Sequence, residues 1–152
     1  MHFQLSVTIR RSPEDVFGFL RDKDKHPQKP GSPVLVLEQI TPGPPGVGTR
    51  YREVVQMLPL VRCEILSVVT LFEPGERLEE DYTGAGMIGH LAYRFAPEDG
   101  GTRLTQQETV RTRGLLRAIE PVMERMLSRQ LWKRLEAIKG ALDSGWGVAK
   151  QE

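Results

Sequence analysis

The chain has 152 residues, 39% of them hydrophobic and 27% charged, which is typical of a single globular domain. Its 21 Lys and Arg nearly balance its 20 Asp and Glu, so a net charge of +1 does not argue for a nucleic-acid partner. Residues 1–8 lack the apolar core of a signal peptide, and no run reaches the roughly 18 apolar residues of a membrane span. With a single cysteine, Cys63, these features favour a reducing, cytoplasmic setting.

The first predicted element is a strand over residues 3–9, because apolar and polar residues alternate there. Ser12 and Pro13 then predict the start of a short helix. The Ser12 hydroxyl can accept a hydrogen bond from the free N–H of Asp15, and Pro13 loses no bond at the first helical position. We expect this helix to end before the turn around His26, which we interpret as a structural residue.

Strand-like segments separated by Gly and Pro follow this helix. Short turns join them, and the clearest is Pro97-Glu98-Asp99-Gly100-Gly101, so the pattern indicates an antiparallel meander. In the third segment both sets of alternate residues are apolar, and its inner face cannot be assigned. The predicted segments are residues 34–40, 49–57, 62–72, 78–83, 87–96 and 102–112.

An amphipathic helix over residues 115–142 closes the chain, and Pro121 predicts a kink or a fresh start within it. Its apolar residues recur every three or four positions on one predicted face: Leu116, Ile119, Met123, Leu127, Leu131, Leu135, Ile138 and Leu142. Its basic residues are assigned to the opposite, solvated face: Arg117, Arg125, Arg129, Lys133, Arg134 and Lys139.

Four short motifs, in this order and spacing, give the chain a family resemblance. They are residues 12–20, Asp24-Lys25-His26-Pro27, Gly48-Thr49-Arg50-Tyr51, and Tyr93-Arg94-Phe95 leading to residues 100–104. Over residues 3–142 the pattern resembles the START-like superfamily of helix-grip (SRPBCC-type) proteins, in particular its polyketide-cyclase/dehydrase-like branch.

The resemblance implies an α+β helix-grip fold with a ligand cavity. About seven antiparallel strands would wrap around the long C-terminal helix, two short helices would follow the first strand, and the cavity would lie between sheet and helix. We expect one START-like domain over residues 1–143 and a frayed tail over residues 144–152.

Polar residues on the inner, apolar face of the sheet are the functional candidates. If Leu104 and Val110 face the helix, Gln106 and Glu108 share that face. Desolvation would raise the pKa of such a carboxyl, which suits acid–base chemistry or a bond to a ligand hydroxyl. Alternatively, a bulge turns these residues to solvent or a nearby Arg neutralises them. The predicted ligand-binding residues are Tyr51, Glu53, Met57, Tyr82, Met87, Tyr93, Gln106, Glu108, Met123 and Leu127.

Three functions stay open at this point, and the sequence does not decide whether the protein is an enzyme. The resemblance implies binding of a small hydrophobic or amphipathic ligand, such as a lipid, polyketide or aromatic compound. A cyclase/dehydratase-type enzyme would use Glu108 or Glu53 together with Tyr82 to shuttle protons. An interaction module would instead present the basic helix face to an acidic partner.

No metal or cofactor is implied. No Cys or His spacing suggests a metal site, no phosphate-binding loop is present, and His90 is assigned to the outer face of its strand. Stable membrane insertion is not expected, because the sheet needs the apolar face of the helix. Exposed strand edges allow a homodimer.

Overall fold

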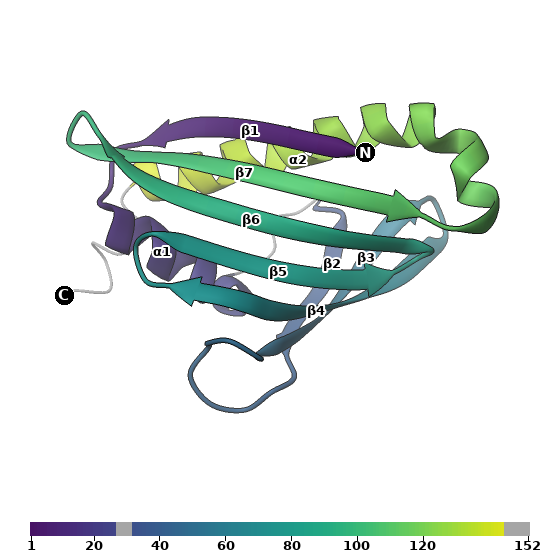
Figure 1. Cartoon of the computed structure of the whole chain (residues 1–152), viewed down its shortest axis with the longest axis horizontal. Helices are drawn as coiled ribbons and strands as arrows, with labels where there is room; N and C mark the ends of the chain where they lie inside the picture. Colours follow the sequence, from purple (N-terminus) through teal and green to yellow (C-terminus); the bar gives the residue numbers. More distant parts are fainter. Residues whose placement is uncertain (27–31, 145–152) are drawn as a thin grey trace.

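The protein is described from a computed structural model of the chain, which describes residues 1–26 and 32–144 and, within these, the backbone but not the side chains of Met57 and Leu58. An antiparallel sheet has the strand order β1-β7-β6-β5-β4-β3-β2 (Figure 1). The strands are β1 (His2–Ile9), β2 (Val34–Gln39), β3 (Arg50–Leu58), β4 (Val61–Glu73), β5 (Arg77–Gly84), β6 (Met87–Glu98) and β7 (Gly101–Thr112).

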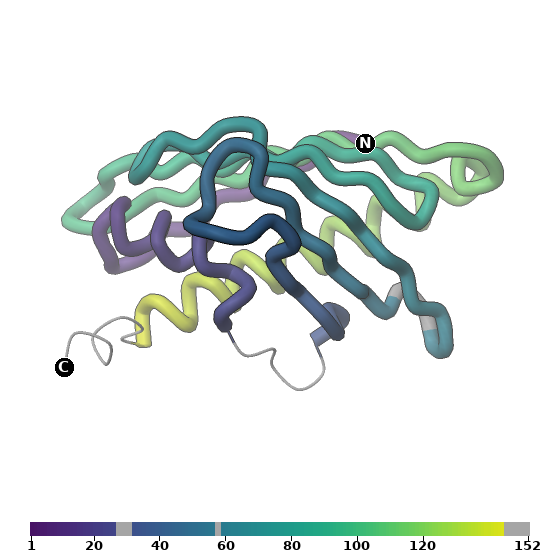
Figure 2. The backbone as a smooth tube through the Cα atoms, turned by 90° about the horizontal axis from the view of Figure 1, so that it is seen from below, coloured from purple at the N-terminus to yellow at the C-terminus, as the bar shows by residue number. Residues whose placement is uncertain are grey.

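The helices are α1 (Pro13–Arg21), the 3₁₀ helix η1 (Lys23–Lys25), the 3₁₀ helix η2 (Gly114–Ile119) and α2 (Glu120–Asp143). Figure 2 shows α1 and α2 on the same side of the sheet, with α2 running lengthwise beneath it. The α+β helix-grip architecture, with seven strands and two short helices after β1, is therefore confirmed. The predicted tail lies outside the described residues, except for Ser144, which caps α2.

Local sequence explains where α1 begins and how it packs. The Ser12 hydroxyl accepts a hydrogen bond from the Asp15 N–H at 3.2 Å, and Pro13 opens the helix, as predicted. Phe17 is 2% exposed and packs edge-on against Phe72, at 5.1 Å between ring centroids, and Phe95, at 5.3 Å. Helix α1 thus covers one end of the inner face, where it shares a core cluster with the C-terminal half of α2.

Helix α2 begins at Glu120, one residue before Pro121, so the predicted fresh start is confirmed. The prediction that Ile119 belongs to one continuous apolar face is wrong, because its side chain is 49% exposed. Residues 114–119 form the 3₁₀ helix η2, whose three residues per turn displace side chains from the stripe of an α-helix. The buried residues of α2 are Met123, Leu131, Leu135, Ile138 and Leu142.

The basic face of α2 follows the prediction with one exception. Four of its residues are exposed: Arg117 (in η2), Arg125, Arg129 and Lys133. Lys139 also lies on this face, with its side chain 41% exposed and paired with Asp143 at 2.8 Å. Arg134 was assigned to this face, and that assignment is wrong, because its side chain is partly buried and interacts with carboxylates of the sheet. It lies three residues after Leu131 and four before Ile138, on the stripe that packs against the sheet.

A β-bulge explains why both sets of alternate residues in β4 are apolar. The pairing of β4 with β5 shifts between Val69 and Leu71, so Thr70 is the extra residue. Before the bulge, Val69 lies opposite Glu80 and is buried; after it, Phe72 lies opposite Leu78 and joins the core. The inner face therefore changes from odd to even residues within one strand.

Candidate ligand-binding site

Cross-strand register places the predicted site residues on one concave surface. In β7, Glu108 lies opposite Phe3 and Leu91, while Gln106 lies opposite Leu5 and Tyr93. The seven predicted residues of the sheet with described side chains share this inner face: Tyr51, Glu53, Tyr82, Met87, Tyr93, Gln106 and Glu108. Met123 and Leu127 face it from α2, and the side chain of Met57 lies outside the described residues.

A hydrogen-bonded trio of polar side chains lies at the centre of this surface. The Tyr82 hydroxyl donates to Glu108 Oε2 at 2.9 Å, and Gln106 Nε2 lies 3.4 Å from Glu108 Oε1. Glu108 is 8% exposed and Gln106 only 1%. The Gln106 carbonyl oxygen, Oε1, is buried and has no hydrogen-bond partner among the described residues. The trio therefore keeps an unused acceptor inside the protein, which costs free energy unless something pairs with it.

Burial decides the chemistry of Glu108. Removal from water raises the pKa of its carboxyl, whereas the Tyr82 hydroxyl and the positive charge of Arg134 lower it. Burial outweighs them, and the pKa of Glu108 lies above its ordinary value. A carboxyl of this kind exchanges its proton closer to neutral pH than an exposed glutamate does, as a general acid or base requires.

Arg134 is the cation of the cluster. Burial alone would lower the pKa of its guanidinium, but the Tyr93 phenol and three carboxylates outweigh burial and raise it. Those carboxylates belong to Glu53, Glu108 and Glu80. Arg134 therefore holds its charge while facing the sheet. The alternative that a nearby Arg compensates the inner carboxylates agrees with this arrangement.

Tyr82, a member of the trio, and the neighbouring Tyr93 keep their protons. Burial and the neighbouring Glu108 raise the pKa of Tyr82, and burial raises the pKa of Tyr93 to about 12. The Tyr82 ring lies over Gly89, its partner across the β5–β6 pair; a Cβ at Gly89 would lie 2.0 Å from Cζ of that ring. The missing side chain of Gly89 therefore provides the space that Tyr82 occupies beside Glu108.

A buried ion pair lies on the side of the site near α1. Lys23 of η1 places its Nζ 2.7 Å and 2.8 Å from the two carboxylate oxygens of Glu80. The same ammonium lies 4.3 Å from the centroid of the Tyr51 ring, and burial together with nearby carboxylates raises the pKa of that phenol. Lys23 thus compensates Glu80 and fixes Tyr51.

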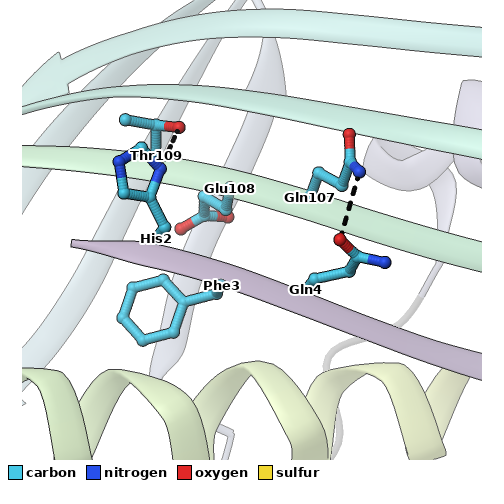
Figure 3. A pocket seen from close by; sticks show the side chains of 6 residues that line it. All are labelled: His2, Phe3, Gln4, Gln107, Glu108 and Thr109. Atoms are coloured by element: carbon cyan, nitrogen blue, oxygen red, sulfur yellow. Dashed lines mark hydrogen bonds between the residues drawn. The ribbon is translucent and has the colours of Figure 1, made fainter.

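Two hollows lie beside β1, at the edge of the sheet. A hollow of about 340 Å³ is lined by His2, Phe3, Gln4, Gln107, Glu108 and Thr109. In Figure 3, Phe3 projects from β1 toward α2, while hydrogen bonds join His2 to Thr109 and Gln4 to Gln107. A groove of about 680 Å³ shares His2, Phe3 and Gln4 with the hollow and continues to Pro121, Glu124, Arg125, Ser128 and Arg129 of α2. We name this space the β1–α2 groove.

The histidines lie away from the inner face where the structure tests them. His90 is on the outer face of β6, 45% exposed at its side chain, with Nδ1 2.6 Å from Asp81 Oδ1. His26 Nε2 lies 2.7 Å from the Phe19 carbonyl oxygen and its ring stacks on the Phe19 ring, which agrees with a structural role. Within residues 1–26 and 32–144, no group of three His, Cys, Asp or Glu side chains could hold a metal ion.

The sequence analysis missed three residues of this site: Arg134, Lys23 and Glu80. The position of Arg134 was visible in the helical spacing, seven residues after Leu127 on the apolar stripe. Glu80 was visible through its shared parity with Leu78 and Tyr82. Lys23 had no signal, because only the tertiary packing of η1 brings it to the sheet.

Comparison with known proteins identifies the family. The family model described as "Polyketide cyclase / dehydrase and lipid transport" matches residues 1–143. The chain belongs to this family. The resemblance to START-like helix-grip proteins, inferred from four short motifs, is thereby confirmed. A search of curated proteins found no match to this chain.

Solved structures similar to this family member share its fold. The Zhui aromatase/cyclase from Streptomyces sp. R1128 has a TM-score of 0.77 at 16% identity, over 94% of this chain and 93% of its own. The di-domain ARO/CYC StfQ of the steffimycin biosynthetic pathway has a TM-score of 0.76 at 16% identity, over 94% of this chain and 50% of its own.

DR_A0006 from Deinococcus radiodurans has a TM-score of 0.65 at 22% identity, over 95% of this chain and 98% of its own. At these identities the similarities describe the fold alone. Among the described helices, none combines the length and the apolar character that crossing a membrane would require.

Proposed function

We propose that this protein binds a small hydrophobic or amphipathic ligand between the inner face of the sheet and α2. The observation that supports the proposal is the polar trio of Tyr82, Gln106 and Glu108 inside an otherwise apolar interface. A core that served only stability would gain by replacing these groups with apolar ones, because buried polar groups cost free energy. A ligand with one polar end would form hydrogen bonds with these groups.

The surroundings of the trio suit an apolar ligand body. Beside Glu108 lies a small cluster of buried Met87, Val110 and Met123, packed with Phe3 and Leu127. Methionine side chains adapt to irregular apolar shapes, and Phe3 also lines the hollow at Glu108. We therefore place the polar end of the ligand at Gln106 and Glu108 and its apolar body along this cluster, with the β1–α2 groove as its entrance.

Native mass spectrometry of freshly purified protein tests this proposal directly. A retained small molecule should be released by organic extraction, and adding it back should raise the melting temperature. Glu108→Gln should reduce that rise, whereas Glu64→Gln, on the exposed outer face of β4, should not. If no molecule is retained and no member of a hydrophobic ligand panel raises the melting temperature, the binding function is wrong and the interaction module becomes the better hypothesis.

Acid–base catalysis is a second candidate, and the Tyr82–Glu108 contact favours it. Tyr82 donates to Glu108 Oε2 at 2.9 Å, whereas Gln106 Nε2 lies 3.4 Å from Oε1, so Oε1 is the more weakly bonded oxygen and the one that would act on a ligand. As carboxylate, Glu108 would remove a proton from the carbon beside a ligand carbonyl. The electron pair left on that carbon would form a carbon–carbon double bond and expel the β-hydroxyl. Glu108 would return its proton to that leaving oxygen, so the products would be the unsaturated carbonyl compound and water.

A β-hydroxyketone probe, 4-hydroxy-4-phenylbutan-2-one, tests this second candidate. Its dehydration extends the conjugation of the aromatic ring and changes its ultraviolet absorbance. Wild-type protein and Glu64→Gln should accelerate the change, and Glu108→Gln should lose at least about 100-fold of that rate, the lower range for a general base. Equal rates for Glu108→Gln and wild type would exclude Glu108 as the base.

A further inference from the structure

Exposed apolar side chains gather in two segments that are far apart in the sequence. Leu60, between β3 and β4, is 99% exposed, and Leu115, at the start of η2, is 93% exposed. Three more large apolar side chains near them are exposed: Val61, Ile119 and Val122. Single exposed apolar residues are ordinary on a protein surface, but a concentration of them marks an interaction surface.

The register of the strands places both segments at the same end of the sheet. Ile65 of β4 lies opposite Gly84 of β5. In the same row of residues, Gly84 lies opposite Met87 of β6, and Met87 lies opposite Thr112 of β7. The β3–β4 hairpin precedes Ile65 in the chain and η2 follows Thr112, so both extend beyond this row, at the right-hand end of Figure 2. We name residues 59–62 and 111–122 the hairpin–η2 end.

The charges of the hairpin–η2 end are positive up to residue 119. Residues 58–63 and 109–119 contain no Asp or Glu, and they hold four exposed arginines: Arg62, Arg111, Arg113 and Arg117. Within residues 1–26 and 32–144, none of the four forms an ion pair. Glu120, the next acidic residue, accepts a hydrogen bond from the Thr112 hydroxyl.

The opposite end of the sheet carries the opposite charge. Its β4–β5 and β6–β7 turns hold four acidic residues: Glu73, Glu76, Glu98 and Asp99. A negatively charged surface would therefore attract the hairpin–η2 end and repel the other end, which fixes the orientation in which the protein approaches it.

We propose that the hairpin–η2 end docks on a lipid membrane surface that carries anionic headgroups. Its apolar side chains enter the interfacial layer of the bilayer, and its arginines lie at the headgroup phosphates. Protein interfaces are typically centred on aromatic anchors, and residues 59–62 and 111–122 contain no Trp, Tyr or Phe. The contact is peripheral, because Leu115, Ile119 and Val122 lie outside the buried face of α2, which stays packed on the sheet.

Sedimentation with lipid vesicles tests the proposal on the full chain. Vesicles of phosphatidylcholine with about 30% phosphatidylglycerol should bind the protein at least about 10-fold more tightly than vesicles of phosphatidylcholine alone. Raising the salt concentration from about 0.05 M to about 0.5 M should weaken this binding, because salt screens the attraction between arginines and headgroups.

A pair of apolar substitutions tests the inserted side chains. Leu60→Asn combined with Leu115→Asn should weaken binding to the mixed vesicles at least about 10-fold, because two apolar side chains no longer leave water. Asn tolerates the left-handed backbone at Leu60, where φ is 68°, so the fold should be kept. Val47→Asn is the control, since Val47 is 68% exposed in the β2–β3 loop, at the other end of β3 from the hairpin.

A pair of charge substitutions tests the arginines. Arg113→Gln combined with Arg117→Gln should weaken binding about 10-fold or more, since each basic residue near an anionic surface contributes about 5-fold. Arg94→Gln combined with Arg103→Gln removes the same charge from exposed positions near the β6–β7 turn. This control pair should change binding less than about 2-fold, because Arg94 lies seven residues along β6 from Met87, about 23 Å and beyond the screening length.

Three outcomes would overturn the proposal. One is no binding to the mixed vesicles at low salt, and another is a loss in the control variants equal to that in the hairpin–η2 variants. The third is a dimer in sedimentation velocity that Leu115→Asn dissociates, without vesicle binding, because this end would then contact a second copy of the chain. The proposal does not depend on the ligand-binding function, and none of these outcomes tests that function.

Discussion

Two hydrogen-bonded carboxylates, Glu108 of β7 and Asp81 of β5, allow a direct comparison of the two faces of the sheet. On the inner face, Glu108 accepts a hydrogen bond from Tyr82 at 2.9 Å. On the outer face, Asp81 lies 2.6 Å from His90. Tyr82 and Asp81 are adjacent in β5, so the pleat alone sends them to opposite faces.

The comparison shows that solvent access, more than the hydrogen bond itself, decides what each pair can do. Burial is the largest influence on Glu108 and raises the pKa of its carboxyl. The bond to Asp81 is the largest influence on His90 and raises the pKa of its ring, while the side chain stays 45% exposed. The outer pair is a screened surface interaction, whereas the inner pair holds a carboxylate in a state that a ligand or a substrate can use.

Removing the Arg134 guanidinium should have the largest effect on stability. Arg134→Leu leaves Glu53, Glu80 and Glu108 without its compensating charge and should lower the free energy of unfolding by about 3 kcal/mol at neutral pH. The loss should shrink in acid as the carboxylates are protonated. Urea denaturation at several pH values measures it, with the exposed Arg129→Leu as the control at under about 0.5 kcal/mol. Equal losses for both variants would contradict an inward role for Arg134.

Filling the space under Tyr82 should have the next largest effect. A methyl group at Gly89 would overlap the Tyr82 ring, so Gly89→Ala should cost about 1–3 kcal/mol and move Tyr82 away from Glu108. In a Tyr82→Ala background the same change should cost far less. Gly46→Ala is the matched control, since a Cβ there meets nothing within 4 Å. An equal cost of Gly89→Ala with and without Tyr82 would exclude the contact as its cause.

Neutralising Glu108 should have a smaller effect, and it should raise rather than lower the free energy of unfolding. Because the folded-state pKa of Glu108 is raised, its ionised form destabilises the fold at pH values above that pKa. Glu108→Gln should therefore be slightly more stable than wild type at neutral pH, on the order of 1 kcal/mol or less. The gain should vanish as the pH falls below the unfolded value of about 4.3. Denaturation curves that show a gain only in acid would reverse this assignment.

The outer pair should give the smallest effect. The raised pKa of His90 contributes stability that is complete below the unfolded value of about 6.5 and is lost as the pH rises through the folded pKa. Asp81→Asn should lower the titration midpoint of the His90 ring in NMR spectra. It should cost less than about 1 kcal/mol near pH 5 and nothing measurable near pH 9. A midpoint that does not move would show that Asp81 is not the partner.

Much of the fold could be predicted because its signals are local. Alternation defined the strands, Ser12 and Pro13 defined the start of α1, and Pro121 marked the start of α2. Parity also placed Gln106 and Glu108 together on the inner face. Their hydrogen bonds could not be predicted, since the Tyr82–Glu108 contact joins two strands that are not neighbours in the sheet and depends on its curvature.

The misjudged residues show where local reasoning ends. Arg134 was assigned by its charge rather than by its spacing, although the spacing was correct for the inner face. Ile119 was assigned by an α-helical period that the chain does not follow before Glu120. The inner face of β4 was left open because the sequence does not reveal the extra residue, Thr70.

The extra residue Thr70 divides β4 into two parts whose inner residues can be substituted independently. Before the bulge, Cys63, Ile65 and Ser67 lie opposite the inner residues of β3, and they would form one wall of the proposed ligand site. After it, Phe72 belongs to the core under α1. Exchanging the three wall residues could diversify ligand preference without disturbing folding, whereas deleting Thr70 would force one half of the strand to turn its solvent face inward. A library at positions 63, 65 and 67 is thus the natural starting point for re-engineering specificity.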